Sequence, residues 1–238
     1  LVGGRAGAPV DLMPGLDADC PTRPFGGDED FTISPDGRWL VYAAKVVAGS
    51  AEAWSTNDDI WAVPTDASAA PRAITADNQA RDSQPLFSPD GQRLAWLAMR
   101  RPGYEADRYR VVVMDWPGGE QRVLTESWDR SPNGLSWAAD GSALYVDAGN
   151  VGATSIFRVS VDTGMATAVV TRHTNSGPTP LPDGSLLFAR DHLRSPAELF
   201  VLEPGAPEPR QLTALNRERL AAVPLGRLSC LRGGWPPR

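Results

Sequence analysis

The chain has 238 residues, of which 42% are apolar and 22% charged, with a formal net charge of −6. These proportions are ordinary for a globular protein, and the acidic balance lacks the basic footprint of a nucleic-acid-binding domain. Glycine (23) and proline (22) are in excess. So many breakers exclude a helical bundle and favour many short strands joined by turns. No apolar run approaches the roughly 18 residues that span a membrane, and the absence of a signal-peptide pattern slightly favours the cytoplasm.

A short turn sequence recurs four times along the chain. It occurs in ISPDGRWLVY, FSPDGQRLAW, WAADGSALYV and LPDGSLLFAR, where the Asp-Gly steps begin at Asp36, Asp90, Asp140 and Asp183. Proline presets φ at the second position of a type I turn, aspartate suits the third position and glycine the fourth. Each segment therefore predicts two short strands joined by a tight turn.

A second shared segment follows each turn. These segments end at Thr75, Thr125, Thr171 and Thr213, which are separated by 50, 46 and 42 residues. Each predicts an apolar third strand, such as residues 111–114, and a more polar fourth strand, such as 121–125. A repeat of this length with four strands is typical of a β-propeller blade. The sequence therefore predicts an all-β fold: a partial β-propeller of about four four-stranded antiparallel blades, with Pro-Asp-Gly repeats of the TolB or WD type.

The recurring turn and the recurring threonine segment also divide the chain into parts. Residues 1–30 are interpreted as the end of a preceding blade with its link, and residues 31–215 as the four blades. Residues 216–238 are expected to form a linker. The four blades are placed at about 31–75, 84–125, 135–171 and 178–213.

The same pattern assigns the two faces of the propeller. The turns between the first and second and between the third and fourth strands are short and lie on one face. The loops between the second and third strands and the links between blades are predicted to be long and to share the other face, where binding usually occurs. These loops carry more acidic than basic residues, which predicts a weak preference for cationic groups. They cover about 16–30, 43–58, 76–84, 98–108, 126–135, 147–154, 172–179 and 189–196.

The chain shows no catalytic apparatus of its own. The string nearest to a G-x-S-x-G nucleophile elbow surrounds Ser136, but it ends in alanine and leads into a blade turn. His173 and His192 are the available bases, and they are interpreted as surface residues. No catalytic residue, metal site or cofactor is predicted. Cys20 and Cys230 have no metal spacing, and the acidic runs 28–30 and 58–59 lack the spacing of a Ca²⁺ loop.

Three longer segments carry a family resemblance. PFGGDEDFTISPDGRWLVY, GYEADRYRVVVMDW and SWDRSPNGLSWAADGSALYV resemble the propeller of prolyl-oligopeptidase-family serine peptidases, in the subgroup of dipeptidyl peptidase V and acylaminoacyl-peptidase-like enzymes. The resemblance spans roughly residues 11–226. The sequence after Gly226 does not resemble the family and has no strand or helix pattern, which favours an aberrant tail such as a reading-frame shift near Arg227 would give.

The resemblance implies a partner and a set of site residues. In this family a seven- or eight-bladed propeller precedes a C-terminal α/β-hydrolase domain with a Ser-Asp-His triad, which is absent from this chain. The propeller screens access and helps to bind the N-terminus of a peptide substrate. By position, the resemblance implies substrate-binding roles for Tyr104, Glu105, Asp107, Trp128, Asp129 and Arg130.

The alternative roles of these residues are structural. Asp107 and Arg108 would pair locally, Trp128 would fill a gap between blades, and Asp129 would pair with Arg130. A glutamate on the long-loop face could instead pair with a substrate α-ammonium group, and a tryptophan there could pack against substrate side chains.

Two functions follow from these observations. The first is the non-catalytic, substrate-gating propeller portion of a serine peptidase that cleaves short peptides near their N-terminus. The second is a free-standing, TolB-like propeller that binds protein partners. No nucleic acid or membrane is expected as a partner. An arc of four blades leaves two apolar blade faces open, which predicts self-association.

Overall fold

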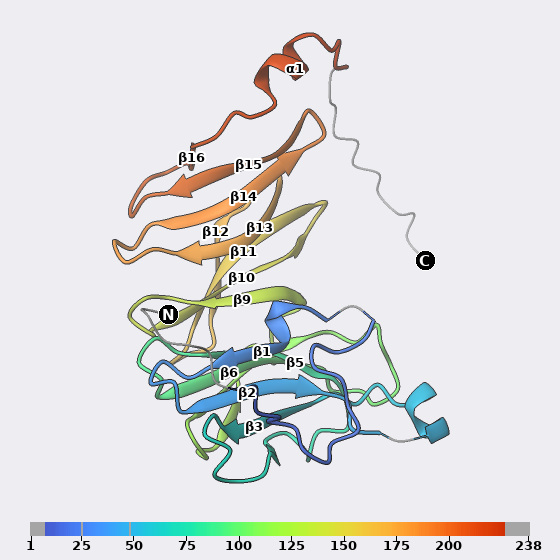
Figure 1. Cartoon of the computed structure of the whole chain (residues 1–238). Coiled ribbons are helices and arrows are strands. Elements are labelled where there is room, and N and C mark those ends of the chain that lie inside the picture. Colours follow the sequence, from blue (N-terminus) through green and yellow to red (C-terminus); the bar gives the residue numbers. More distant parts are fainter. Residues whose placement is uncertain (1–7, 25, 48, 227–238) are drawn as a thin grey trace, which may run out of the picture.

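The computed structural model describes residues 8–24, 26–47 and 49–226, and in it the strands form four antiparallel units in chain order (Figure 1). The predicted tail at 227–238, including Cys230, lies outside the described residues. The first unit contains β1 (Phe31–Ile33), β2 (Trp39–Ala44), β3 (Asp59–Pro64) and β4 (Arg72–Ala73). The second contains β5 (Asp82–Phe87), β6 (Arg93–Ala98), β7 (Arg110–Asp115) and β8 (Gln121–Val123). The third contains β9 (Pro132–Trp137), β10 (Ala143–Asn150), β11 (Ala153–Ser160) and β12 (Ala166–Val170), and the fourth β13 (Thr174–Pro180), β14 (Leu186–His192), β15 (Ser195–Leu202) and β16 (Arg210–Gln211).

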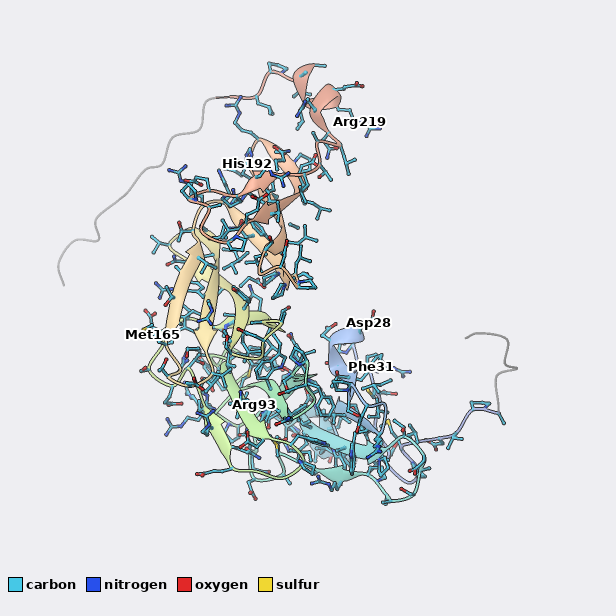
Figure 2. The ribbon with its side chains drawn as sticks, turned by 90° about the vertical axis from the view of Figure 1, so that its left-hand side faces the viewer. Asp28, Phe31, Arg93, Met165, His192 and Arg219 are labelled. Atoms are coloured by element: carbon cyan, nitrogen blue, oxygen red, sulfur yellow. The ribbon has the colours of Figure 1, made fainter. Side chains whose placement is uncertain are left out.

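These units are the blades of the predicted partial propeller, so the predicted fold class is confirmed. Within each blade the strands pair antiparallel in chain order, and the third and fourth blades are also joined by one parallel pairing between Thr154 and Thr174. The blades follow one another along an open arc (Figure 2). Short helical segments η1 (Asp28–Asp30) and α1 (Arg217–Ala221) precede and follow the blades, and η2 (Gly49–Ala53) lies in the loop between β2 and β3.

The four Pro-Asp-Gly-type turns are built alike. In each, the glycine has a positive φ of 68° to 83°, a conformation that glycine adopts without steric cost. Its N–H donates to the carbonyl oxygen three residues earlier, at 2.8 to 3.0 Å. The aspartate Oδ1 accepts the backbone N–H two residues further on, which closes the turn from the other side. The turn sequence therefore fixes the start of every blade through local hydrogen bonds.

The recurring threonine also has a physical role. In three blades its Oγ1 accepts the backbone N–H of a third-strand residue at 2.9 Å: Thr75 accepts from Ile60, Thr125 from Val111 and Thr213 from Leu199. The hydroxyl thus takes the place of a fourth-strand backbone carbonyl as acceptor, at the point where the third and fourth strands stop pairing. Blade three differs, because β12 continues pairing to Val170 and leaves Thr171 exposed.

The core lies between successive blades. The inner strands are apolar on both faces because each blade is covered by a neighbour on either side. One buried cluster joins blades one and two around Trp96, a second joins blades two and three around Val146, and a third joins blades three and four around Phe188.

The two end faces of the arc differ in how far they are covered, and the N-terminal segment covers part of the first one. On the first blade, Tyr42 and Val63 are buried beneath the N-terminal segment, whose covering residues are Leu12, Met13, Leu16, Ala18 and Cys20. On the fourth blade, Leu199 and Leu212 remain 43% and 46% exposed. On the first blade Phe31 and Ile33, which pair with Tyr42 and Leu40 on the same face, remain 39% and 56% exposed. Among the described residues, apolar surface is therefore exposed at both ends of the arc.

The expectation of long loops in every blade was wrong for the third and fourth. The β10–β11 connection consists of Val151 and Gly152, and the β14–β15 connection of residues 193–194. Val151 and Gly152 both have positive φ (49° and 78°), as a two-residue hairpin turn requires. The long loops therefore belong to the first two blades. No helix in the described part of the chain has the length and apolar character needed to cross a bilayer.

Candidate functional site

A charged groove opens on the long-loop face beside the first two blades. It consists of a larger cavity of about 410 Å³ and a smaller cavity of about 220 Å³, and the two share the residues Thr22, Arg23, Lys45 and Asp58. Their walls come from the segment before β1, the β2–β3 loop, the link before β5 and the β6–β7 loop. We call this the loop-face groove; its remaining polar lining residues include Asp17, Asp19, Glu52, Ser55, Thr56, Arg81 and Glu105.

An ion pair forms one side of the groove wall. Asp58 is buried and its Oδ2 lies 2.9 Å from Nε of Arg81. Burial raises the pKa of Asp58, although the positive charges of Arg81 and Lys45 oppose the rise. The backbone carbonyl of Asp58 also accepts the N–H of Asp82 at 2.8 Å, which fixes the loop to the start of β5. The charge of Asp58 is thus already compensated within the protein.

The loop between β6 and β7 holds the first three predicted site residues. The carboxylate of Asp107 accepts the backbone N–H groups of Arg100 and Arg101, both at 2.8 Å. Burial by itself would raise the pKa of Asp107, but these N–H groups lower it overall. The guanidinium of Arg101 stacks on the ring of Tyr104 at 4.1 Å. Asp107 and Tyr104 therefore shape the loop.

Glu105 is the predicted residue that reaches the loop-face groove. Its side chain is exposed and makes no hydrogen bond or ion pair with any described residue. The loop that carries it is tied across to the first blade, because the N–H of Gly103 donates to Oγ1 of Thr56 at 2.9 Å. An uncompensated carboxylate on a tethered loop can receive a cationic group.

The other three predicted residues lie at the junction of blades two and three. Trp128 is half-buried and packs edge-on against Phe157, with ring centroids 4.9 Å apart, beside the core. Arg130 pairs with Asp129 at 2.6 Å and donates to Oδ1 of Asn150 at 3.3 Å. None of the three lines the loop-face groove. The structure thus brings Glu105 to the groove and leaves these residues in local contacts.

Sequence reasoning did not identify most of the groove residues. Lys45, Arg81 and Thr22 belong to no motif, and Asp58 drew notice only as a member of an acidic pair. The available signal was the predicted length of the loops 16–30, 43–58, 76–84 and 98–108, since long loops gather on the binding face. What places these residues together is the folding of the N-terminal segment against the first blade.

The structure also shows the surroundings of the serine, histidine and acidic residues that the sequence analysis considered for catalysis or metal binding. Ser136 lies within β9, opposite Tyr145 and outside any strand-to-helix turn. His173 and His192 stack on each other with ring centroids 4.8 Å apart. Asp30 is buried and accepts both the N–H and the hydroxyl of Thr22, at 2.8 and 2.7 Å. Within the described ranges, no three metal-ligating side chains gather into a site.

Sequence comparison identifies relatives with a shared name. The chain is 29% identical over 207 residues to dipeptidyl-peptidase 5 of Porphyromonas gingivalis, covering 87% of this chain and 30% of that protein. It is 35% identical over 156 residues to dipeptidyl-peptidase 5 of Aspergillus fumigatus, covering 61% of this chain and 21% of that protein. The chain therefore spans less than a third of the length of these relatives. No family model matches the sequence.

Comparison with solved structures shows the fold. A puromycin hydrolase superposes with a TM-score of 0.62 at 23% identity, covering 78% of this chain and 30% of that one. The acylaminoacyl peptidase of Pyrococcus horikoshii gives 0.62 at 16% identity, covering 81% and 28%. A TolB protein of Agrobacterium tumefaciens gives 0.59 at 22% identity, covering 76% and 63%. The dipeptidyl-peptidase 5 relatives and the blade architecture together place this chain in the prolyl-oligopeptidase family, as a portion of its β-propeller.

Proposed function

We propose that this chain is the non-catalytic, substrate-gating portion of a serine peptidase that cleaves short peptides near their N-terminus. The observation that carries the proposal is the exposed carboxylate of Glu105 on the wall of the loop-face groove, which pairs with no residue that the structure describes. Two facts about relatives support it: those similar over most of this chain are named dipeptidyl-peptidase 5, and they extend far beyond it.

The groove suits a short peptide with a free amino terminus. A cavity of about 410 Å³ is at the lower end of the range for ligand pockets, which is roughly 300–1,000 Å³. Asp58 is neutralised by Arg81 at 2.9 Å, whereas Glu105 has no such partner among the described residues. An α-ammonium group would therefore pair with Glu105. Lys45 and Arg23, which also line the groove, would disfavour a cationic residue further along the peptide.

Gating follows from the position of the groove on the long-loop face. In the family that the sequence resembles, this face looks toward the hydrolase domain. A groove there would hold the amino end of a peptide while its next bonds extend toward the catalytic domain. The alternative of a free-standing, TolB-like propeller is supported by likeness of fold alone, at 22% identity.

Peptide binding by the purified chain tests the proposal. We expect a short peptide with a free amino terminus to bind, and its N-acetylated form to bind about three- to tenfold more weakly, because one partly exposed ion pair is lost. Glu105→Gln should weaken binding of the free peptide by a similar factor. Glu120→Gln, which makes the same change in an exposed turn between β7 and β8, is the matched control.

Equal binding of the free and acetylated peptides, or equal effects of Glu105→Gln and Glu120→Gln, would overturn the role of Glu105. The link to a peptidase has an independent test in the flanking DNA. We expect that DNA to encode a G-x-S-x-G sequence in one of its reading frames downstream of the blades. A downstream region with no hydrolase-like sequence in any frame would favour the free-standing propeller.

A further inference from the structure

A buried arginine without a counterion among the described residues lies between the third and fourth blades. Arg190 in β14 is 8% exposed and shares its face of the strand with Phe188. The guanidinium carbon lies 5.3 Å from the ring centroid of Phe188 and 4.9 Å from that of Phe200 in β15. These two rings and the neighbouring blade remove most of the water from around the charge. Keeping a charge in such a place is costly unless it is paired.

Among the described residues, the side chain of Arg190 has one hydrogen-bond partner, which is neutral. Its Nε donates to Oδ1 of Asn175 at 2.8 Å. Asn175 is itself fully buried and anchored, because its Nδ2 donates to the carbonyls of Thr154 and Arg172 at 2.7 and 2.8 Å. The two terminal nitrogens of Arg190 hydrogen-bond to no residue that the structure describes. Asn175 therefore anchors the Nε side of the guanidinium, while the terminal nitrogens remain unbonded to any described residue.

The two carboxylates near Arg190 interact with other residues. Glu198 is the cross-strand neighbour of Arg190, but its carboxylate accepts from Thr213 and Asn216. Glu208 stands with Arg172 at the rim, 3.8 Å from that guanidinium, and both side chains are largely exposed. Neither carboxylate forms an ion pair with Arg190 in the described stretches of the chain.

Arg190 lines a small crevice of about 80 Å³. Arg172, Arg190 and Glu208 supply its charged groups, and Val169, Val170 and Pro207 are among its apolar walls. One water occupies about 30 Å³ of liquid, so the crevice has room for two or three water-sized groups. That is the size of a carboxylate with the carbon that bears it.

We propose that this crevice between blades three and four binds a carboxylate group, with the donor fork of Arg190 as its main ligand and Arg172 at its rim. A planar, singly charged group suits the fork, which can donate two parallel hydrogen bonds to a carboxylate. The carboxylate of Glu208 at the rim would repel a doubly charged anion such as phosphate. The carboxylate could come from a free small acid or from the C-terminus of a peptide. This inference does not depend on the role of Glu105.

The Nε–H signal of Arg190 gives a direct readout. Because this N–H is buried and hydrogen-bonded to Asn175, its side-chain resonance in a ¹H–¹⁵N spectrum should be separate from those of exposed arginines. We expect a saturable shift when sodium acetate is added to the full chain up to about 50 mM, with a dissociation constant on the order of 10 mM for a single charge-assisted contact. Sodium chloride at equal ionic strength is the reference.

Three variants separate the site from general charge effects. Glu208→Gln removes the competing carboxylate and should tighten acetate binding severalfold. Arg210→Gln removes an exposed arginine of the same blade, which pairs with Glu203 at 2.9 Å, and should leave binding unchanged. Arg190→Gln should abolish acetate binding, which is then followed through the backbone signals of Asn175. Since Glu208→Gln leaves Arg190 in place, the test survives even if Arg190→Gln fails to fold.

The source of the carboxylate is decided by two peptides. An N-acetylated dipeptide with a free C-terminus that binds, while its C-terminal amide does not, assigns the crevice to peptide C-termini. Binding of acetate without the dipeptide assigns it to free small acids. No saturable shift with either ligand, a chloride response of equal size, or unchanged affinity in Glu208→Gln would overturn the proposal.

Discussion

The repeated threonine offers the sharpest test of how the blades are held together. The hydroxyl of Thr125 accepts the N–H of Val111 at 2.9 Å, and both residues are essentially buried. Thr125→Val keeps the shape of the side chain but leaves that N–H without an acceptor. A buried, unsatisfied donor costs about 1–3 kcal/mol, so the free energy of unfolding should fall by that amount.

The third blade supplies a matched control within the same chain. Thr171 occupies the corresponding place in the repeat but is exposed, and its hydroxyl accepts no bond from a described residue. Thr171→Val should therefore change stability by no more than about 0.5 kcal/mol. Thr125→Ser, which restores the hydroxyl, should recover most of the loss seen in Thr125→Val.

Urea unfolding followed by tryptophan fluorescence measures these differences. With a slope of about 2 kcal/mol per molar urea, the midpoint of Thr125→Val should fall by roughly 0.5–1.5 M at an unchanged slope. If Thr125→Val and Thr171→Val have equal midpoints, or if Thr125→Ser is as unstable as Thr125→Val, the hydroxyl does not replace a ladder carbonyl.

Three further predictions concern pH, catalysis and association. Burial raises the pKa of Asp82 from its ordinary value of 3.8 to about 7, so the unfolded chain releases this proton first, and stability should fall as pH rises from about 4 to 7. The urea midpoint should decrease over this pH range, and Asp82→Asn should reduce that dependence on pH. An Asp82→Asn variant whose midpoint depends on pH as strongly as the wild type would contradict the assignment. The purified chain should hydrolyse no dipeptidyl or acyl-aminoacyl substrate, and a fluorophosphonate label that Ser136→Ala removes would disprove this. Because Leu199 and Leu212 are exposed on the fourth blade, the chain should self-associate, as measured by light scattering behind a sizing column. Leu199→Asp should reduce the self-association. A monomeric wild-type chain at tens of micromolar would exclude association through this face.

Local chemistry explains why the blades were predictable from the sequence. The turn at Asp90 and Gly91 closes through hydrogen bonds between residues two and three apart, and Thr125 completes a ladder within its own blade. These contacts need no information from distant regions of the chain. The alternation of apolar strands and turns then favours an arrangement in which each blade buries its apolar faces against its neighbours.

The same local reasoning misjudged the loops of the later blades. Residues 147–154 combine glycine, asparagine and alanine, a composition typical of a loop. In the structure Val151 adopts a positive φ next to Gly152, which allows a two-residue hairpin and lets β10 and β11 extend. A valine in that conformation is not expected from propensity, because its branched side chain disfavours it. Pairing across the whole hairpin outweighs that local preference.

The candidate sites depend on contacts that the sequence does not specify. The sequence indicated that Glu105 lies on the binding face, but its neighbours in the groove include Arg23 and Lys45, which lie far earlier in the chain. The crevice at Arg190 arises because two phenylalanine rings and an asparagine from another strand meet one guanidinium between blades. Hydrogen bonds within a turn are set by neighbours in sequence, so the sequence determined the repeat. Glu105 and Arg190 form no ion pair with a described residue because charged groups from distant parts of the chain are placed elsewhere, and only the tertiary structure decided that.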